Sequence, residues 1–489
     1  MTDKVGAVMV VGGGIAGIQA SLDLAESGYY VYLVEASPAI GGVMAQLDKT
    51  FPTNDCSMCI LSPKLVEAGR HLNIQTLTYS EVVKVEGEPG NFEITVRKKP
   101  RYIDPSKCTG CGECPQACPV PIKNQFDEGL VDRKAIYRPY AQAFPNIFTI
   151  EKGDRAPCTL TCPAGINVQG YVALTGAGKY REALSLIREN LPLPGVLGRI
   201  CPHPCEKECN RKELDEPIAI CELKRFVADQ IKTELPIQKE EAKEEKVAIV
   251  GSGPAGLTAG AYLATKGYPV TIFEALPVMG GMLYTGIPSY RLPRDLLAEE
   301  IKTIQSLGVE IKTNFPIGPH LTLDDLFRQG YRAVFLGVGA HKDQKLNIPG
   351  EENPNVLPGV AFLRKANLGE KVEVGRRVAV IGGGNVAMDA ARTSLRMGAQ
   401  EVSILYRRSL SEMPANEEEI KEAEEEGIQF QFLTAPTEIM IKDGKVTSLR
   451  CLRMELGEPD ASGRRRPVPI QGSDFFVETE TIIPAIGQT

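Results

Sequence analysis

The sequence has only four histidines and no tryptophan in 489 residues. This scarcity argues against a zinc enzyme built on histidine ligands. Basic residues do not outnumber acidic residues either. The net charge of −7 argues against nucleic acid as a main partner, because phosphate binding needs a basic face. We find no membrane span: the apolar start from Val5 to Ile18 is glycine-rich, lacks a cleavage-site pattern and is typical of a strand and a phosphate loop. We expect a cytoplasmic protein.

Cysteine is almost confined to one part of the chain. Of the 13 cysteines, all but Cys451 lie between Cys56 and Cys221. In a cytosolic protein, clustered cysteines indicate metal or redox chemistry rather than structural disulfides. The hydrophobic content of 43% is ordinary for a globular protein, and the length suffices for about three domains.

A glycine-rich turn between two apolar runs predicts a dinucleotide-binding fold. The runs are residues 247–250 and 270–273, and an acid ends the second one. The first glycine makes the tight turn, the second lets the backbone approach a pyrophosphate, and the third allows the helix to pack against the strand. The acid, Glu274, can hold a ribose hydroxyl. The glycine pair that follows it, Gly280-Gly281, is typical of flavoproteins. We expect residues 333–340 to form a buried strand of this fold. The expected FAD contacts are Gly251, Gly253, Gly256, Glu274 and Gly281.

The same pattern occurs a second time, near the N-terminus. The two copies align without a gap through the glycine pair Gly41-Gly42. An acid at the end of the second strand favours a bare ribose, as in FAD or NAD. The alternative is a decayed nucleotide fold that keeps only its packing glycines, because its downstream half is missing. The candidate contacts are Gly12, Gly14, Gly17 and Glu35.

A third nucleotide-binding pattern begins at Val378. Its last glycine is replaced by alanine, an accepted variant. Two arginines follow the next strand, where the other copies carry an acid. Arginines suit a 2′-phosphate, so NADP is favoured over NAD. The candidate contacts are Gly382, Gly384, Ala387, Arg407 and Arg408.

The sharpest cysteine motif lies in residues 108–119. Its spacing, Cys-x2-Cys-x2-Cys-x3-Cys-Pro, is that of the bacterial ferredoxin run that holds a [4Fe–4S] cluster. A zinc knuckle is the alternative, although zinc sites normally use two separated pairs. The expected ligands are Cys108, Cys111, Cys114 and Cys118, the last of which could serve its own cluster or another.

The remaining clustered cysteines form two groups. Cys56 and Cys59 stand in a loop-like setting and could be a redox dithiol, half a cluster site or two inert thiols. Six more thiols surround a region, 168–189, that we expect to form two short helices, and Cys205 and Cys209 would share one helical face. Six thiols suffice for one four-iron cluster with two left over; structural thiols are the alternative. The six candidates are Cys158, Cys162, Cys201, Cys205, Cys209 and Cys221.

These patterns divide the chain into segments within an α/β fold class. We expect Rossmann-type, two-dinucleotide-binding flavoprotein domains with a ferredoxin-like [4Fe–4S] insert and a helical, cysteine-rich iron–sulfur domain. The expected segments are an FAD-type half-domain (1–98), a ferredoxin-like segment (99–150), a helical iron–sulfur domain (151–235), a charged linker (236–246), an FAD-binding domain (247–375), an NAD(P)H-binding domain (376–480) and the start of an incomplete return into the FAD domain (481–489).

From about Cys158 onward, the chain resembles the small (β) subunit of glutamate synthase and its relatives, including the NADPH-binding subunit of the bifurcating transhydrogenase. The resemblance lies in the cysteine motifs around Cys162 and Cys201, in 251–256, in Gly286-Ile-Pro-Ser-Tyr-Arg-Leu-Pro293 and in 382–389. It implies that Cys158, Cys162 and Cys201 bind one cluster with Cys221 as a possible fourth ligand, and that Cys205 and Cys209 belong to another. A cysteine pair that the family carries before Cys158 is missing here.

Residues 1 to about 150 resemble the flavin-containing subunit of heterodisulfide reductase. The resemblance lies in Gly12–Gly17, in Asn54-Asp-Cys-Ser-Met-Cys-Ile-Leu-Ser-Pro-Lys64 and in residues 99–108. The family's flavin fold resumes after its ferredoxin insert, whereas this chain changes to the other family near Thr149. We also find no Gly-Asp finger for the flavin, so we expect a fragment or a flavin fold that is completed elsewhere.

The favoured function is an iron–sulfur flavoprotein oxidoreductase that passes electrons between NAD(P)H, FAD and one to three [4Fe–4S] clusters. In this function the protein positions the cofactors and sets their reduction potentials, so no catalytic proton donor is assigned. The expected partner is a redox protein resembling the glutamate synthase large subunit, a heterodisulfide reductase component or ferredoxin, within a hetero-oligomer. The rivals are a heterodisulfide reductase-type scaffold and an inactive truncated protein that binds nucleotides and clusters.

Overall fold

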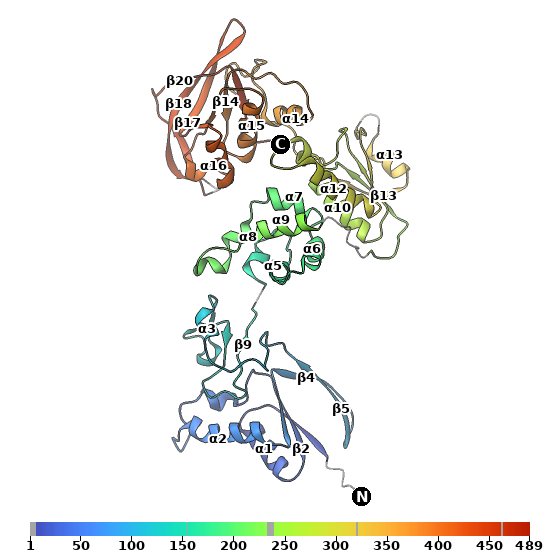
Figure 1. Ribbon diagram of the computed structural model, residues 1–489, viewed down its shortest axis with the longest axis vertical. Coiled ribbons are helices and arrows are strands. Elements are labelled where there is room, and N and C mark those ends of the chain that lie inside the picture. Colours follow the sequence, from blue (N-terminus) through green and yellow to red (C-terminus); the bar gives the residue numbers. More distant parts are fainter. Residues whose placement is uncertain (1–5, 154, 232–238, 319–320, 461–462) are drawn as a thin grey trace. The chain divides into compact units, whose positions relative to one another are not determined.

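The computed structural model describes residues 6–153, 155–231, 239–318, 321–460 and 463–489 (Figure 1). The chain divides into two compact units, each of which is described by itself. Unit 1 holds residues 1–157 and 209–218, and unit 2 holds 158–208 and 219–489. No helix in the described ranges is both long and apolar enough to cross a membrane.

Unit 1 begins with a parallel three-stranded sheet in the order β1-β2-β3. Helix α1 packs on it because Ile18, Leu22 and Ala25, spaced one and two turns apart, are all buried. The strands alternate with the helices as in half of a nucleotide-binding fold. The elements are β1 (Ala7–Val11), α1 (Ile15–Glu26), β2 (Tyr30–Glu35), η1 (Gly42–Gln46), α2 (Ser57–Arg70) and β3 (Ile74–Thr78).

A hairpin, a loop-rich segment and residues 209–218 complete unit 1. Arg101 joins the loop-rich segment to the sheet, because its guanidinium donates to the backbone oxygen of Pro38 and to the hydroxyls of Thr78 and Thr149. All of these groups are buried or nearly so, and charge-assisted bonds of this kind are the strong ones. The elements are β4 (Ser80–Glu88), β5 (Asn91–Lys98), α3 (Cys114–Ala117), β6 (Pro121–Lys123), η2 (Gln125–Asp127), β7 (Asp132–Lys134), β8 (Ile136–Tyr137) and β9 (Thr149–Ile150).

Unit 2 opens with short helices that surround the cysteines. The two helices expected within 168–189 are confirmed as α5 and α6. The shared helical face expected for Cys205 and Cys209 is wrong: α8 ends before Cys209, which caps the separate turn η3 (Asn210–Glu213). Pro204 starts α8, and a single turn is too short to carry both thiols. The helices are α4 (Pro157–Leu160), α5 (Val168–Gly176), α6 (Tyr180–Arg188), α7 (Pro194–Ile200), α8 (Pro204–Lys207) and α9 (Ile220–Gln230).

The first full nucleotide-binding fold of unit 2 is a parallel sheet in the order β12-β11-β10-β13. Strands β10 and β11 are buried almost throughout and form continuous apolar runs, as expected for a parallel sheet covered on both faces. The elements are β10 (Lys246–Val250), α10 (Pro254–Thr265), β11 (Val270–Phe273), α11 (Met282–Thr285), α12 (Arg294–Ser306), β12 (Glu310–Lys312), α13 (Leu323–Arg328) and β13 (Tyr331–Leu336).

The second full nucleotide-binding fold has the sheet order β16-β15-β14-β21. The sequence predicts that the C-terminal strand starts a return into the FAD domain. Thr481–Pro484 form β21, which pairs with Val378 to Ile381, so this sheet extends beyond the predicted boundary at residue 480; the return itself stays a prediction. The other elements are α14 (Gly359–Asn367), β14 (Arg377–Ile381), α15 (Asn385–Arg396), β15 (Glu401–Leu405), η4 (Leu410–Glu412), α16 (Glu417–Glu425) and β16 (Gln429–Gln431). An antiparallel sheet lies between β16 and β21 in sequence, with β17 (Thr434–Lys442), β18 (Lys445–Pro459), β19 (Arg465–Pro469) and β20 (Phe475–Glu478).

The charged linker expected at 236–246 is described only from residue 239 onward. In that part, the backbone N–H of Glu240 donates to Thr265 and that of Lys243 to Gly267, at the end of α10. The described part of the segment therefore runs along the flavin-type fold, and β10 begins directly after it.

Candidate functional site

The glycines of the turn 251–256 have distinct roles. A side-chain carbon on Gly256 would lie 1.9 Å from the oxygen of Gly251, so the helix can pack this close only because residue 256 is glycine. On Gly253 the same carbon would meet nothing within 4 Å. Gly281 packs against another side of the turn, since a carbon there would lie 2.7 Å from the Cα of Gly253. The turn is thus open on the one side from which a phosphate can approach the N-terminus of α10.

A cavity of about 760 Å³ lies over this turn. Exposed apolar side chains form part of its lining. Leu336, at the end of β13, is 56% exposed, and Val338, just beyond it, is 59% exposed. The buried strand expected at 333–340 is therefore wrong, because the end of this strand forms a wall of the cavity. Exposed apolar side chains over a phosphate-binding turn suit the rings of a dinucleotide, so the residues present fit FAD.

Glu274 lies at the edge of this cavity, but its carboxylate is already engaged. One oxygen accepts from the backbone N–H and the hydroxyl of Ser252, and the other accepts from the N–H of Leu276. The side chain is 6% exposed. In this arrangement Glu274 fixes the phosphate turn against the end of β11.

A second cavity, of about 640 Å³, lies over the glycines 382–384. A side-chain carbon on Gly382 would lie 2.2 Å from the oxygen of Ala485, whereas at Gly384 the nearest atom is 4.0 Å away. The middle of the turn is again open, above the N-terminus of the twelve-residue helix α15. Ala387, which stands where the other turns have their third glycine, is fully buried. This donor set fits a second dinucleotide.

The two arginines after β15 have different surroundings. Arg407 is exposed and lines the cavity. Arg408 is 5% exposed; its Nη2 lies 2.7 Å from Oδ2 of Asp460, and its Nε donates to the backbone oxygen of Arg465. Arg408 therefore ties the ends of β18 and β19 to the nucleotide fold, and Arg407 is the better placed of the two to meet a 2′-phosphate.

One short segment of the chain contributes lining residues to both cavities. His341 lines the first cavity, while Asp343 and Gln344 line the second. Two residue steps span at most about 8 Å of backbone. The segment is held by the C-terminal residues, because Lys342 and Thr489 exchange backbone hydrogen bonds of 3.1 and 2.8 Å. Two bound dinucleotides would thus approach each other within one unit.

A buried ion network also connects the two nucleotide folds. Arg291, in the Gly286–Pro293 motif, donates from Nη1 to both oxygens of Asp389 on α15, and its Nε lies 2.6 Å from Oε1 of Glu419 on α16. Burial raises the pKa of Asp389 to about 6, against the lowering effect of Arg291. Arg392 bonds to Glu419 as well, and these side chains are all at most 13% exposed. The network holds the two folds in a fixed orientation.

Four cysteines of unit 2 lie near a buried tyrosine. Burial raises the pKa of the Tyr171 hydroxyl, and nearby thiols of the group raise it further. The neighbouring Cys221 lowers the pKa of the Cys201 thiol, and the Sγ of Cys221 donates to the backbone oxygens of Leu197 and Gly198. Burial raises the pKa of Cys205 to about 11, with added contributions from Cys201 and Cys162. Cys205 therefore lies near two of the ligands expected for one cluster, and its expected grouping with Cys209 stays a prediction. The thiols near Tyr171 are Cys158, Cys162, Cys205 and Cys221.

The region that carries the thiols near Tyr171 is fixed to the flavin-type fold by a buried carboxylate. Glu300 of α12 accepts from the backbone N–H of Gly195 at 2.7 Å and of Val196 at 2.9 Å. Both amides belong to the first turn of α7, which ends at Ile200, directly before Cys201. Burial raises the pKa of Glu300 to about 7. The carboxylate thereby fixes the start of the helix that presents Cys201.

The ferredoxin-type run is a compact turn in unit 1. Burial raises the pKa of Cys114, and Cys111, Cys108 and Cys118 raise it further, so the four sulfurs lie near one another. Nowhere in the described ranges are three cysteine, histidine or acidic side chains placed to hold a single metal ion. A cube of four irons spreads its ligands more widely than one ion does, and the four thiols, none of them in a disulfide, fit that group.

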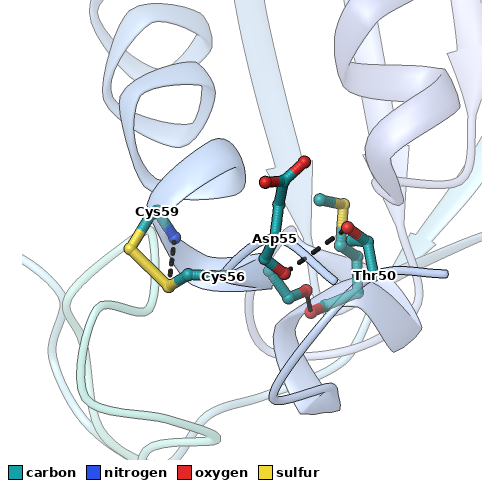
Figure 2. The surroundings of a disulfide bond; sticks show 6 residues. Thr50, Asp55, Cys56 and Cys59 are labelled. Carbon is teal, nitrogen blue, oxygen red and sulfur yellow. Dashed lines mark hydrogen bonds between the residues drawn. A yellow bond between two sulfur atoms is a disulfide. The ribbon is translucent and has the colours of Figure 1, made fainter. Parts of the chain in front are cut away.

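Cys56 and Cys59 form a disulfide at the start of α2 (Figure 2). The loop-like setting expected for them is wrong, because Cys56 is the N-cap of this 14-residue helix and its Sγ accepts the N–H of Cys59 at 3.2 Å. Cysteine is not among the preferred capping residues, so this helix start carries no recognisable cap signal.

The N-terminal fold repeats the glycine geometry of the flavin-type fold but not its sheet. A side-chain carbon on Gly17 would lie 1.9 Å from the oxygen of Gly12, and Gly14 is open. Glu35 accepts from the N–H of Gly13 at 2.6 Å. In the described part of the chain, β1 pairs only with β2, whereas β10 and β14 each have a second neighbour, and Val11 is 67% exposed.

Sequence reasoning missed several residues that line the cavities. His341 and Arg364 reach the first cavity, and Arg464 reaches the second from the antiparallel sheet. These residues lie outside the glycine motifs. One signal was available: His341 is one of only four histidines and directly follows the glycines after β13.

Models of known families match most of the chain. Residues 245–489 match pyridine nucleotide-disulphide oxidoreductase, which is half of the sequence. The chain belongs to this family. Residues 151–235 match dihydropyrimidine dehydrogenase domain II, 4Fe-4S cluster, residues 101–122 match a 4Fe-4S binding domain, and residues 7–57 match FAD dependent oxidoreductase. The chain thus carries FAD/NADP-binding oxidoreductase and [4Fe–4S] binding domains.

Among curated relatives, glutamate synthase [NADPH] small chain of Escherichia coli is 34% identical over 68% of this chain, and the match covers 73% of that protein's length. NADP(+)-dependent formate dehydrogenase subunit beta of Moorella thermoacetica is 48% identical over 68% of this chain, and NADPH-Fe(3+) oxidoreductase subunit beta of Geobacter sulfurreducens is 47% identical over 78%. The chain spans only 51% and 57% of the length of those two relatives. The structure of Mycobacterium tuberculosis FprA with NADPH matches with a TM-score of 0.45 at 25% identity, covering 50% of this chain and 71% of that one.

Proposed function

We propose that this chain transfers electrons between NADPH, FAD and [4Fe–4S] clusters, to or from a redox partner protein. The short segment 341–344, which contributes lining residues to both cavities, carries this proposal. Hydride transfer requires the nicotinamide and the acceptor ring to meet at van der Waals distance, and the two phosphate-binding turns of unit 2 open into cavities that share this segment.

The described parts of unit 2 each have a defined task in this function. The turn at Gly253 and the apolar end of β13 would hold FAD, and the turn at Gly384 with Arg407 would hold NADPH. The bound flavin supplies the change from hydride to single electrons. The ion network around Arg291 fixes the two nucleotide folds, and Glu300 fixes the helix that presents Cys201.

The cysteines are proposed as cluster ligands in two places. Cys108, Cys111, Cys114 and Cys118 would hold one cluster, and the thiols around Tyr171 would hold another. The partner is proposed to be a redox protein in a hetero-oligomer, because the matched relatives are named as beta subunits or a small chain. The resemblance of residues 1–150 to the flavin-containing subunit of heterodisulfide reductase remains a prediction.

The test is NADPH-dependent reduction of ferricyanide by anaerobically purified full-length chain, with flavin and iron counted. Gly253→Val should lose flavin, because it fills the opening that a pyrophosphate needs. Gly384→Val should keep flavin and lose NADPH oxidation. The proposal fails if the wild-type chain holds flavin but oxidises no NADPH, or if Gly253→Val retains its flavin.

A further inference from the structure

We propose that Arg464 binds the 2′-phosphate of NADPH together with Arg407, and that a turn of the antiparallel sheet therefore determines the choice between NADPH and NADH. The turn joins β18 to β19 and comprises residues 459–465, of which the structure describes all but 461 and 462. It lies outside the strand–turn–helix unit that holds the glycines 382–384. The inference rests on the proposed function for one thing, the binding of NADPH over those glycines.

Side-chain contacts attach this turn at both ends to the loop after β15. The guanidinium of Arg408 lies 2.7 Å from Oδ2 of Asp460, the residue after β18, and donates to the backbone oxygen of Arg465 at 2.7 Å. Arg465 begins β19, and its Nε donates to Oε1 of Glu412 at 2.7 Å. Arg408 and Glu412 are both buried, with 5% and 7% exposure. The turn is therefore held beside the nucleotide fold by groups that water hardly reaches.

Arg464 stands next to these contacts and lines the second cavity. Its carbonyl oxygen accepts the N–H of Asp460 at 2.8 Å, which fixes the backbone of the turn. Arg407 lines the same cavity. Each of the two arginines is the direct neighbour of one partner in the hydrogen bond between Arg408 and Arg465, and one residue step spans about 3.8 Å. Arg407 and Arg464 therefore reach the cavity at the same end.

The charge at this end of the cavity suits an anion. Residues 406–412 and 459–465 together carry two more positive than negative charges, because they hold four arginines and two acids. Asp343 is the only acid among the described residues that line the cavity, and its carboxylate already accepts from two backbone N–H groups at the start of α14. A phosphate monoester bears a charge of about −1.5 to −2 at neutral pH, and guanidinium groups form strong, charge-assisted hydrogen bonds with it.

The three successive arginines from Arg464 to Arg466 have separate surroundings. Arg464 lines the cavity, and Arg465 pairs with Glu412. Arg466 is exposed and lines neither of the two nucleotide cavities in the described part of the chain. A role in solubility would apply to all three side chains and leaves the approach of Arg464 to the cavity unexplained. Arg466 is therefore the matched control for Arg464.

The 2′-phosphate is the group that NADPH has and NADH lacks. A glycine turn at a helix N-terminus binds the pyrophosphate, which both nucleotides share, so the turn at 382–384 does not distinguish them. The distinction needs side chains around the phosphorylated ribose, and the two arginine forks approach it from two different sheets. Arg408 is a positioning residue in this arrangement, because it holds the turn that carries Arg464.

The test measures binding by titration calorimetry, with the purified full-length chain and two nucleotides that differ only in the 2′-phosphate, 2′,5′-ADP and 5′-AMP. Neither probe takes part in electron transfer. The wild-type chain should bind 2′,5′-ADP at least about a hundred times more tightly than 5′-AMP, because two arginines contribute. Arg464→Ala should weaken 2′,5′-ADP binding about ten-fold, the loss expected for one phosphate-pairing arginine, and should leave 5′-AMP binding unchanged.

The matched control and the probes separate the possible outcomes. Arg466→Ala should bind both probes as the wild-type chain does. If Arg464→Ala keeps the full wild-type preference for 2′,5′-ADP, this inference is wrong and the proposed function stands. Equal losses for both probes in Arg464→Ala would assign that side chain to the adenosine part and would also overturn the inference. A wild-type chain that binds neither probe refutes the NADPH site and, with it, the proposed function.

A double variant tests the positioning role of Arg408. Arg408→Ala should weaken 2′,5′-ADP binding in the wild-type chain, because the turn loses its attachment to the loop after β15. In the Arg464→Ala background, the same change should alter that binding by less than about two-fold, since the arginine that the turn carries is already gone. An equal loss in both backgrounds would show that Arg408 contacts the phosphate itself and would overturn its positioning role.

Discussion

The carboxylate of Glu300 gives this protein a pH dependence that can be calculated from its surroundings. Burial raises its pKa from 4.5 to about 7, while two backbone N–H groups of α7 oppose the rise. At 1.36 kcal/mol per pKa unit, this rise corresponds to about 3 kcal/mol. A raised carboxyl pKa means that the folded state prefers the protonated form, so opening of α7 becomes easier as pH rises from about 4.5 to 7.

The assay is hydrogen exchange of residues 194–200 at pH values from 5.5 to 8.5, with correction for intrinsic exchange. The free energy of opening in the wild-type chain should fall by about 2 kcal/mol between pH 5.5 and 7, and it should level off above pH 7. In Glu300→Gln, which cannot ionise, this fall should be absent. The glutamine also leaves one of the two N–H groups without an acceptor, at a cost of about 1–3 kcal/mol.

Glu299→Gln is the matched control, because Glu299 precedes Glu300 on the same helix and is exposed. It should keep the wild-type pH dependence. If Glu300→Gln shows the same fall between pH 5.5 and 7 as the wild-type chain, another group titrates and the role given to Glu300 is wrong.

Variants at the nucleotide site, the ferredoxin run and the ion network test the remaining assignments. Arg407→Ala should weaken NADPH binding about ten- to hundred-fold and change NADH use little, as measured by KM for both nucleotides, whereas Arg408→Ala should lower the melting temperature through the lost bond to Asp460. Equal losses for NADPH and NADH in Arg407→Ala would contradict this. Cys111→Ser should lower the iron content by about four per chain, and an unchanged iron count or bound zinc would exclude the cluster. Arg291→Met should lower the free energy of unfolding, measured with denaturant, by about 3–5 kcal/mol. The loss should be larger at pH 8 than at pH 5.5, because at pH 8 Asp389 ionises without its partner. A loss below about 1 kcal/mol would contradict a buried, coupled network.

The local motifs were predictable because each depends on a few neighbouring residues. The glycine turns at 12–17, 251–256 and 382–387 are dictated by backbone contacts within a single strand–turn–helix unit, and the structure shows those contacts. The ferredoxin spacing works in the same way, since its four thiols lie within eleven residues of each other. Matching family models confirm the fold class and the cofactor classes that these motifs predicted.

The errors came from features that local pattern cannot show. Cys56 does not belong to the usual capping residues, so the helix start at Ser57 has the sequence pattern of a loop. Cys205 and Cys209 have the spacing of one helical turn, but Pro204 begins a helix that ends at Lys207. The strand near Ala333 is apolar because it borders a cavity, and an apolar run has the same appearance whether protein or a cofactor covers it.

The order of the amino acids is enough to establish the chemistry of this chain: three nucleotide turns, the ferredoxin run and an excess of thiols in one part of it. Which of these residues work together is visible only in the folded chain. Folding pairs the buried Arg408 with Asp460 and leaves Arg407 exposed at the same cavity. It also pairs Arg291 with Asp389 across 98 residues, and it places Glu300 at the start of the helix that leads to Cys201. Such long-range pairs depend on the packing of whole folds, because a buried charge takes its partner from whichever element comes to lie against it.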